Sequence, residues 1–382
     1  MAEKTKLTNT PRLLAGMHDA GLDALVAASP ENFFYTSGAK ILTQTQIRDR
    51  LALSVTYGDG TTTLVVNKVE EAQARRYSWI EDVRTYAEFV DSPMKVVASI
   101  LDEKGLSRSR IGVEKKYVTA AYYEDLQSRL PNASLVSGDA TFGWARMVKT
   151  EPEIEALRRA ASGTDEAIDR ALKGAKPGDA EYELARSMSD TLFEVGQGEF
   201  RDITWGVATG PNVLTTHYWA GTRKIEAGDP IRINVRSTFR GYYSHLYRIG
   251  IVGEPNDEQQ RWYERGRDVH MRSIRRMRPG ARACDLYAAT KDDIKALGID
   301  FRGHLTGHST GIALHEDPRL QPLDQTVLEP GMVLAAEPMI RDETARDPNL
   351  AVFHLEDLVL VTEGDPVILS DRTNTERLIV VG

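Results

Sequence analysis

Hydrophobic and polar residues in the first part of the chain follow two periods in turn. Apolar residues three and four positions apart predict amphipathic helices at 10–22, 93–106 and 119–131. Short β-branched or apolar runs between them predict strands at 23–29, 110–114 and 133–138, and a hairpin at 50–67 with a Gly-Asp-Gly turn. Helices and strands in alternation indicate an α/β domain.

The rest of the chain has longer helices and a different strand pattern. Predicted helices cover 151–173, 179–196, 257–277 and 283–298. Predicted strands cover 202–210, 332–340, 351–364 and 376–381, with a hairpin at 233–252. Neighbouring strands of this kind can pair antiparallel, which indicates an α+β domain. We therefore predict two domains, 1–148 and 149–382.

The hairpin "INVRSTFRGYYSHLYRIGIV" (233–252) carries two residues that a buried strand should avoid, Asn234 and His245. A four-residue loop at 238–241 would place these two side chains directly opposite each other, close enough to share one ligand.

The same pairing would place Arg236 opposite Tyr243. Because side chains alternate between the faces of a strand, Tyr243, His245 and Tyr247 would share the face of Asn234. This face is either a polar surface in solvent or part of a site.

Three further segments favour a site. The Gly-rich stretch "GHLTGHSTGIALHEDP" contains His304, His308 and His315, and imidazole suits both metal binding and proton transfer near neutral pH. Glu337 ends an apolar strand, and Glu356 lies with an aspartate in the middle of another. A buried carboxylate costs several kcal/mol unless it is paired, protonated or bound to a cation. Together these residues predict a functional site.

The order and spacing of these segments resemble the pita-bread superfamily, which contains methionine aminopeptidases, aminopeptidase P, prolidases and creatinase. The motifs that carry the resemblance are the hairpin, "GHSTG", "HEDP", "LEPGMVLAAEPM" and "LEDLVLVTEG". Creatinase, prolidase and aminopeptidase P also have an α/β domain before the catalytic one, so the resemblance covers nearly the whole chain. It implies an α+β fold with a C-terminal pita-bread catalytic domain and a creatinase/prolidase-like N-terminal domain.

The resemblance also implies where metal ligands would lie. Metal-dependent members bind two divalent ions through Asp, Asp, His, Glu and Glu, which by motif correspond here to Asn234, His245, His308, Glu337 and Glu356. Both aspartates are replaced, and the neutral carbonyl of an asparagine is a poor substitute, which implies that the first ion is lost. The last four residues could hold one Zn, Mn or Fe ion. The expected cofactor is none or this one divalent ion.

Creatinase, a relative without metal, hydrolyses a guanidino C–N bond with a histidine as acid and base. The string "HYWAGTRKIEAGD" resembles it and places His217 at the corresponding position. Peptidases of the superfamily also have a histidine there that contacts substrate. Tyr247 stands where creatinase has a Glu that binds guanidinium, which argues against creatine as the substrate.

C–N hydrolysis requires that water lose a proton and that the leaving nitrogen gain one. The predicted catalytic residues are His217, His315, Glu337 and Glu356. The predicted substrate-binding residues are Asn234, His245, His304, Tyr243, Tyr247 and Arg48. Arg48 is included because this region of creatinase supplies an arginine for the substrate carboxylate across a dimer. A surface position for Arg48 is the alternative.

Composition narrows the class of partner. The formal charge of −8 argues against nucleic acid, which requires clustered Lys and Arg. The single cysteine, Cys284, excludes an intrachain disulfide framework and a multi-Cys metal site.

Without an apolar signal core or a run of about 18 apolar residues, we expect no membrane segment and a cytoplasmic location. The resemblance implies a homodimer that acts on a small molecule.

The preferred hypothesis is a hydrolase of an amide, lactam or amidine C–N bond in a small nitrogenous metabolite, with acid/base chemistry like that of creatinase and a degenerate metal site. One alternative is an Xaa-Pro dipeptidase-type metallopeptidase with a mononuclear site. Another is a binding protein without catalysis. A C–S lyase ranks lowest, because the lyase of this superfamily keeps its aspartate ligands.

Overall fold

The computed structural model describes residues 6–47, 49–345, 347 and 350–382. The chain divides into two compact units, Met1–Arg146 and Met147–Gly382, and each is described by itself. The domain boundary between residues 148 and 149 stays a prediction.

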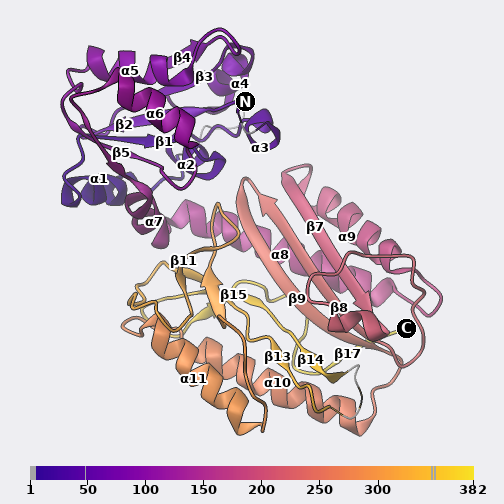
Figure 1. Cartoon of the computed structure of the whole chain (residues 1–382). Coiled ribbons are helices and arrows are strands. Elements are labelled where there is room, and N and C mark those ends of the chain that lie inside the picture. The colour runs from indigo at the N-terminus through magenta and orange to yellow at the C-terminus, as the bar shows by residue number, and fades with distance from the viewer. Residues whose placement is uncertain (1–5, 48, 346, 348–349) are drawn as a thin grey trace. The chain divides into compact units, whose positions relative to one another are not determined.

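A mixed sheet forms the centre of the first unit, in the strand order β4-β3-β2-β1-β5-β6 (Figure 1). Its strands are β1 (Ala24–Ala27), β2 (Leu53–Tyr57), β3 (Thr62–Asn67), β4 (Val83–Tyr86), β5 (Arg110–Val113) and β6 (Ser134–Ser137). Strand β1 pairs antiparallel with β2 and parallel with β5. Every residue of β1 is buried, as expected for a central strand that is covered on both faces.

The helices of this unit cover the sheet. They are α1 (Thr10–Asp19), α2 (Pro30–Ser37), α3 (Leu42–Gln46), α4 (Glu71–Tyr77), α5 (Pro93–Glu103), α6 (Ala120–Arg129) and α7 (Asp139–Met147), with a 3-10 turn at Lys68–Glu70. One core cluster joins β1 to α5 and α6, and includes Val26, Val97 and Leu126. A second joins β3 to α2 through Leu64 and Phe33. The α/β class predicted for this unit is confirmed.

The second unit contains a sheet in the order β17-β9-β8-β7, which carries the polar hairpin. Its strands are β7 (Phe200–Thr209), β8 (Pro230–Phe239), β9 (Tyr242–Val252) and β17 (Ile379–Val381). The helices α8 (Glu151–Gly174) and α9 (Glu181–Gly196) pack along it (Figure 1). Both helices begin with a Glu three residues after the N-cap whose carboxylate accepts the N-cap N–H, which explains why acidic residues mark these starts.

A second sheet of this unit has the order β11-β10-β12-β15-β16. Its strands are β10 (Gly307–Ser309), β11 (Glu316–Arg319), β12 (Val333–Ala336), β15 (Asp357–Leu360) and β16 (Val367–Ile368), and a separate pair joins β13 (Ile340–Arg341) to β14 (Val352–Phe353). The helices α10 (Asp257–Arg275) and α11 (Ala283–Ala296) share core clusters with these strands (Figure 1). The α+β class predicted for this unit is confirmed.

The predicted register of the hairpin is wrong. Strands β8 and β9 are joined by the two residues Arg240 and Gly241, not by a four-residue loop, so Asn234 lies opposite Tyr247, and Arg236 lies opposite His245. Both turn residues have positive φ, at 50° and 88°, as in the tight turns that match the twist of a hairpin. An arginine is uncommon in this conformation, which explains why the sequence favoured a longer loop.

The predicted strand at 351–364 is interrupted. It forms β14 and β15, and the residues between them leave the sheet. Glu356 therefore lies in this break, not in the middle of a strand, and it forms an isolated bridge with Tyr247 of β9. Within the ranges that the structure describes, no helix is both long and apolar enough to cross a membrane.

Candidate active site

Polar side chains from both sheets of the second unit meet where β9 contacts the break before β15. The backbone N–H of Glu356 donates to the carbonyl oxygen of Tyr247 at 3.3 Å. The Nη1 of Arg248 donates to the carbonyl oxygen of Glu356 at 2.6 Å. These contacts hold Glu356 beside the strand that carries His245.

Arg248 is fully buried and is fixed by two carboxylates. Its Nε donates to Asp165 at 3.0 Å, and its Nη2 donates to Asp357 at 2.8 Å. Burial lowers the pKa of Arg248, but Asp357 and Asp165 outweigh burial and raise its pKa. His270 adds a contact to Asp357 at 2.8 Å. This network fixes β9 to β15 and thereby sets the position of Glu356.

Glu356 is fully buried, and neither of its carboxylate oxygens has a hydrogen-bond partner among the described residues. Its Oε1 lies 3.1 Å from Nδ1 of His245, but the two atoms are not aligned as a hydrogen bond. Burial raises the pKa of Glu356 well above its ordinary value, and burial lowers the pKa of His245. A carboxylate in this position requires a proton or a cation.

His308, on β10, is held in one tautomer. Its Nδ1–H donates to the carbonyl oxygen of Ser309 at 3.0 Å, so Nε2 carries the lone pair. This Nε2 lies 3.6 Å from Oε2 of Glu337 and 3.9 Å from Oε1 of Glu356. A lone pair that faces two carboxylates is a favourable arrangement only around a cation or a proton.

Glu337 follows β12 directly and contacts His354, whose Nε2 lies 3.1 Å from its Oε1. Burial raises the pKa of Glu337, but the hydrogen bond from His354 and the nearby histidines outweigh burial and lower its pKa to about 2. The ring of His354 stacks on Tyr247, with 3.6 Å between ring centroids. His354 therefore orients Glu337 within the site.

Asn234 and His245 contact each other diagonally across the hairpin. The Nδ2 of Asn234 lies 3.2 Å from Nε2 of His245, whereas Oδ1 of Asn234 is buried without a partner. The amide N–H of Asn234 donates to Nε2, so the proton of a neutral His245 is on Nδ1, the nitrogen nearer Glu356. A cation at Nδ1 would require the amide to turn over, so that Oδ1 of Asn234 accepts Nε2–H of His245.

The structure brings some of the other predicted residues to this cluster. His315 is exposed and stacks on His308, with 3.8 Å between ring centroids, and burial and His308 together lower the pKa of His315 to about 4. Tyr243 is half-buried, and its backbone N–H donates to Gly311. His304 is exposed, and no contact among the described residues joins it to the cluster. Arg48 lies outside the described residues.

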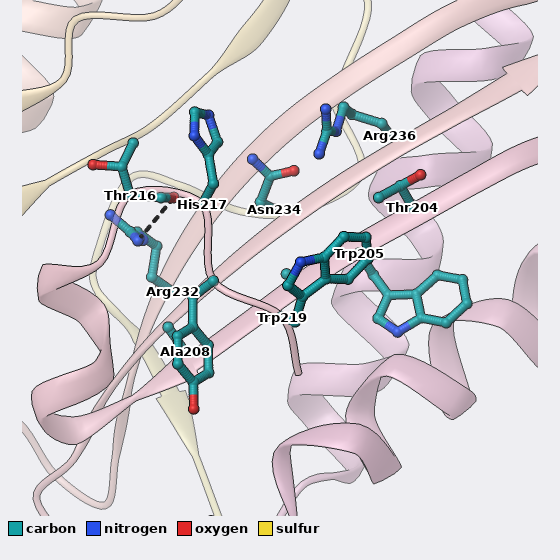
Figure 2. Close-up of a pocket in the computed structure, with 11 residues that line it drawn as sticks. Thr204, Trp205, Ala208, Thr216, His217, Trp219, Arg232, Asn234 and Arg236 are labelled. Carbon is teal, nitrogen blue, oxygen red and sulfur yellow. Dashed lines mark hydrogen bonds between the residues drawn. The ribbon is translucent and has the colours of Figure 1, made fainter. Parts of the chain in front are cut away.

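An open pocket of about 70 Å³ lies beside the cluster, and Figure 2 shows the residues that line it. His217 is exposed on the loop that follows β7, and Asn234 lies in the floor of the same pocket. Gly206 lets this loop approach β7, because a Cβ at this position would lie 2.5 Å from the carbonyl oxygen of Tyr218. His217 and the buried cluster are thus linked through Asn234.

The loop that carries His217 is anchored by Glu181, at the start of α9. Glu181 is fully buried, and its Oε1 accepts the N–H of Thr209 at 2.9 Å and the amide of Asn212 at 3.0 Å. Its Oε2 accepts the N–H of Gly221 at 3.1 Å. One carboxylate therefore holds both ends of the loop, which begins with a 3-10 turn at Gly210–Leu214.

Sequence reasoning missed His354 and the arginines of the pocket. Alternation along the segment places His354 on the same side as Glu356, which is a signal that could have identified it. Arg232 alternates with Asn234 in the same way. The burial of Arg232 depends on the loop that covers it, which no local pattern indicates.

Two groups of three side chains among the described residues could each supply ligands for a divalent ion. Ligand atoms of His245, Glu337 and Glu356 lie within 4.8 Å of one another, and so do those of the three histidines His245, His308 and His315. Two ligand atoms about 2.1 Å from one tetrahedral ion lie about 3.4 Å apart. The separations of 3.1, 3.6 and 3.9 Å in the cluster are close to this value. Imidazole and carboxylate together suit Zn, Mn or Fe.

Comparisons with known proteins agree with this geometry. Residues 155–363 match the model of metallopeptidase family M24, and residues 10–148 match that of the creatinase/prolidase N-terminal domain. The chain is 29% identical over 366 residues to a creatinase of Bacillus sp. (strain B-0618), covering 92% of this chain and 87% of the relative. It is 28% identical over 369 residues to an Xaa-Pro dipeptidase of Pyrococcus furiosus, covering 96% and 97% of the two chains.

Solved structures show the same architecture. A prolidase from Pyrococcus furiosus superposes with a TM-score of 0.77 at 26% identity, over 94% of this chain and all of the other. An X-Pro aminopeptidase from Thermotoga maritima has a TM-score of 0.82 at 23% identity, over 97% and 99% of the two chains. The predicted resemblance to the pita-bread superfamily is confirmed. The chain belongs to metallopeptidase family M24 and is a hydrolase that acts on C–N bonds.

Proposed function

We propose that this enzyme hydrolyses an amide C–N bond in a small substrate, in the manner of an Xaa-Pro dipeptidase, at a site for a single divalent ion. The observation that carries the proposal is the environment of Glu356. This carboxylate is fully buried, both of its oxygens lack partners in the described chain, and it lies beside ring nitrogens of His245 and His308. A bound cation would compensate the cost of burying it.

The residues that would hold the ion are His245, His308, Glu337 and Glu356. Two of them are fixed by neighbours, because His308 donates to Ser309 and Glu337 accepts from His354. Such second contacts orient ligands and set their tautomers. When bound, a divalent ion would polarise the scissile carbonyl and lower the pKa of a water.

The remaining chemistry would come from side chains around the ion. The lowered pKa of Glu337 favours its ionised form, and this carboxylate would accept the proton of the attacking water. His217 is exposed to the pocket and would donate a proton to the leaving nitrogen. His315 projects beside His308 and would donate a hydrogen bond to the oxygen on which charge develops.

The test is metal content and activity of protein purified without a histidine tag. We expect about one Zn, Mn or Fe ion per chain by mass spectrometry, hydrolysis of dipeptides such as Ala-Pro or Leu-Pro, and loss of both after chelation. Glu356→Gln should remove the ion. The matched control is Glu363→Gln, which replaces an exposed carboxylate in the loop after β15. Undiminished hydrolysis by protein without an ion would refute the proposal.

A second candidate is hydrolysis without metal, as the preferred sequence hypothesis expected. It is favoured by the replacement of both aspartates by Asn234 and His245, and by the position of His217 in the pocket. In this case a proton would take the place of the cation at Glu356, and His217 would act as both acid and base. Chelation would then leave the rate unchanged, whereas His217→Ala would abolish it.

We also propose that the enzyme is a cytoplasmic homodimer, as the resemblance implies. A relative described as creatinase and another described as an Xaa-Pro dipeptidase cover nearly the whole chain, which supports a shared two-domain organisation. Light scattering during size-exclusion chromatography would report the mass directly. A mass of 42.5 kDa, that of one chain, would contradict the dimer.

A further inference from the structure

Two arginines of β8 line the pocket beside His217. Arg232 and Arg236 lie on the same face of the strand, on either side of Asn234 (Figure 2). Each arginine is two residues from Asn234, so the Cα atoms of the two arginines are about 13 Å apart along the strand, and a ligand that lies over Asn234 is between their long side chains. The positions opposite them on β7, Ala208 and Thr204, have small side chains, which leaves space above the strands.

Arg232 is buried without an anionic partner. Its side chain is 4% exposed, its Nη2 donates to the carbonyl oxygens of Thr215 and Thr216, and its Nη1 has no partner. No carboxylate of the described residues forms an ion pair with it. Burial lowers the pKa of Arg232, and Arg341 lowers it further, although Tyr247 acts in the opposite direction. An uncompensated guanidinium at this depth is costly unless an anion binds to it.

Two further guanidinium groups add to this charge. Arg236 is half-buried, and its Nε lacks a partner. Arg341 donates to the carbonyl oxygen of Leu214 at 3.0 Å and to Oγ1 of Thr216 at 3.4 Å, which places it behind the same loop. Within the described chain neither forms an ion pair, and the residues that line the pocket include no carboxylate. The pocket lining therefore concentrates positive charge, and Glu356 in the adjacent cluster is a negative charge that acts on Arg236.

The shape of the pocket limits the anion to a small one. The pocket is small, with a volume of about 70 Å³, and Trp219 gives it a flat apolar wall. Asn234 contacts His245 on one side and lines the pocket on the other, so a ligand there lies next to the cluster of Glu356. Guanidinium groups bind planar carboxylates through paired hydrogen bonds.

We propose that Arg232 and Arg236 bind a carboxylate on a side chain of the substrate and make the enzyme selective for acidic substrates. This inference rests on the proposed function and adds a substrate class to it. The same charge repels cationic groups, so a substrate with a guanidinium is disfavoured. The replacement of a guanidinium-binding Glu by Tyr247, which the resemblance implies, agrees with this selectivity.

A binding experiment tests the site without turnover. Calorimetry with glutarate, with its uncharged analogue glutaramide and with inorganic phosphate compares a carboxylate, a neutral group and another anion. We expect glutarate to bind at least tenfold more tightly than either of the others, and each arginine to contribute a factor of about 10 to 100. Equal binding of glutaramide, or a preference for phosphate, would overturn the proposal.

Variants assign the effect to the arginines. Arg232→Gln and Arg236→Gln should each weaken glutarate binding, and Arg232→Gln should not lower the melting temperature, because it removes an unpaired buried charge. Arg236→Gln, at a half-buried position, tests the same site if the first variant does not fold. The matched control is Arg240→Gln in the hairpin turn, where the side chain is 56% exposed and lies 3.8 Å from Glu199. Unchanged affinity in both pocket variants would overturn the assignment.

Turnover separates this inference from the proposed function. Glu-Pro against Gln-Pro, and Ala-Glu against Ala-Gln, differ only in one charge, and we expect kcat/KM to favour the acid by about 10- to 100-fold in at least one pair. Hydrolysis of all four at equal rates would refute the selectivity and keep the proposed function. Binding of glutarate through the arginines without hydrolysis of any dipeptide would keep the anion site and refute the proposed function.

Discussion

The carboxyl group of Glu153 couples the stability of the second unit to pH. Glu153 is 2% exposed and closes the capping box of α8. Its Oε2 accepts the N–H of Thr150 at 2.8 Å, and its Oε1 accepts the hydroxyl of Tyr242 at 3.1 Å. Burial dominates over these hydrogen bonds and raises the pKa of Glu153 from 4.5 to about 7. The folded protein thus binds this proton more tightly than the unfolded chain.

The sign and size of the effect follow from linkage. Because the folded pKa is the higher one, the stabilisation from Glu153 is fully present below pH 4.5 and is lost as the pH rises to about 7. With these two values, the free energy of unfolding falls by about 2 kcal/mol between pH 5.5 and pH 8. Glu153→Gln removes the titration and keeps a side chain that can close the capping box.

Urea unfolding of wild type and Glu153→Gln at both pH values measures this quantity. The free energy of unfolding of the variant minus that of wild type should rise by about 2 kcal/mol from pH 5.5 to pH 8. The control is Glu183→Gln, which occupies the same capping position in α9. The N–H of Ala180 lowers the pKa of Glu183, so this group titrates below the range of the experiment. The same pH dependence in wild type and Glu153→Gln would refute the reasoning.

Two other changes test the framework of the site. Arg248→Met leaves Asp165 and Asp357 buried without a cation, so we expect a loss of about 3–5 kcal/mol in urea unfolding, and a loss below 1 kcal/mol would contradict the network. The double variant Asn234→Asp/His245→Asp restores both carboxylates that the resemblance implies. We expect mass spectrometry to find two ions per chain in this variant, where the wild type has one. An unchanged number of ions would contradict the assignment of these two positions.

The hairpin shows how much of the site the sequence could predict. The side chains of Asn234, His245 and Tyr247 share one face, as predicted, although the register was wrong. The predicted and observed pairings differ by two residues, and a shift of two keeps every side chain on its face. The pattern therefore specified the face, whereas the turn, with an arginine at positive φ, determined the partners.

Other parts of the site depend on contacts that no local pattern contains. His354 contacts Glu337, which lies 17 residues earlier, because the chain leaves the sheet between β14 and β15. In the sequence, Arg232 is one polar residue of an alternating strand, and its burial depends on the loop after β7, whose carbonyl oxygens it contacts. Alternation predicts which side a residue faces, but the segment that closes over that side is set by the tertiary fold.

The anchoring of the His217 loop by Glu181 has a consequence for engineering. The carboxylate binds the two ends of the loop, and Tyr218 near its tip is held to the same anchor through Asn212. Trp219 is 73% exposed, so exchanging its side chain disturbs little of the core. Trp219 is therefore the natural position to diversify in a library, because the backbone that presents it is held from outside the pocket.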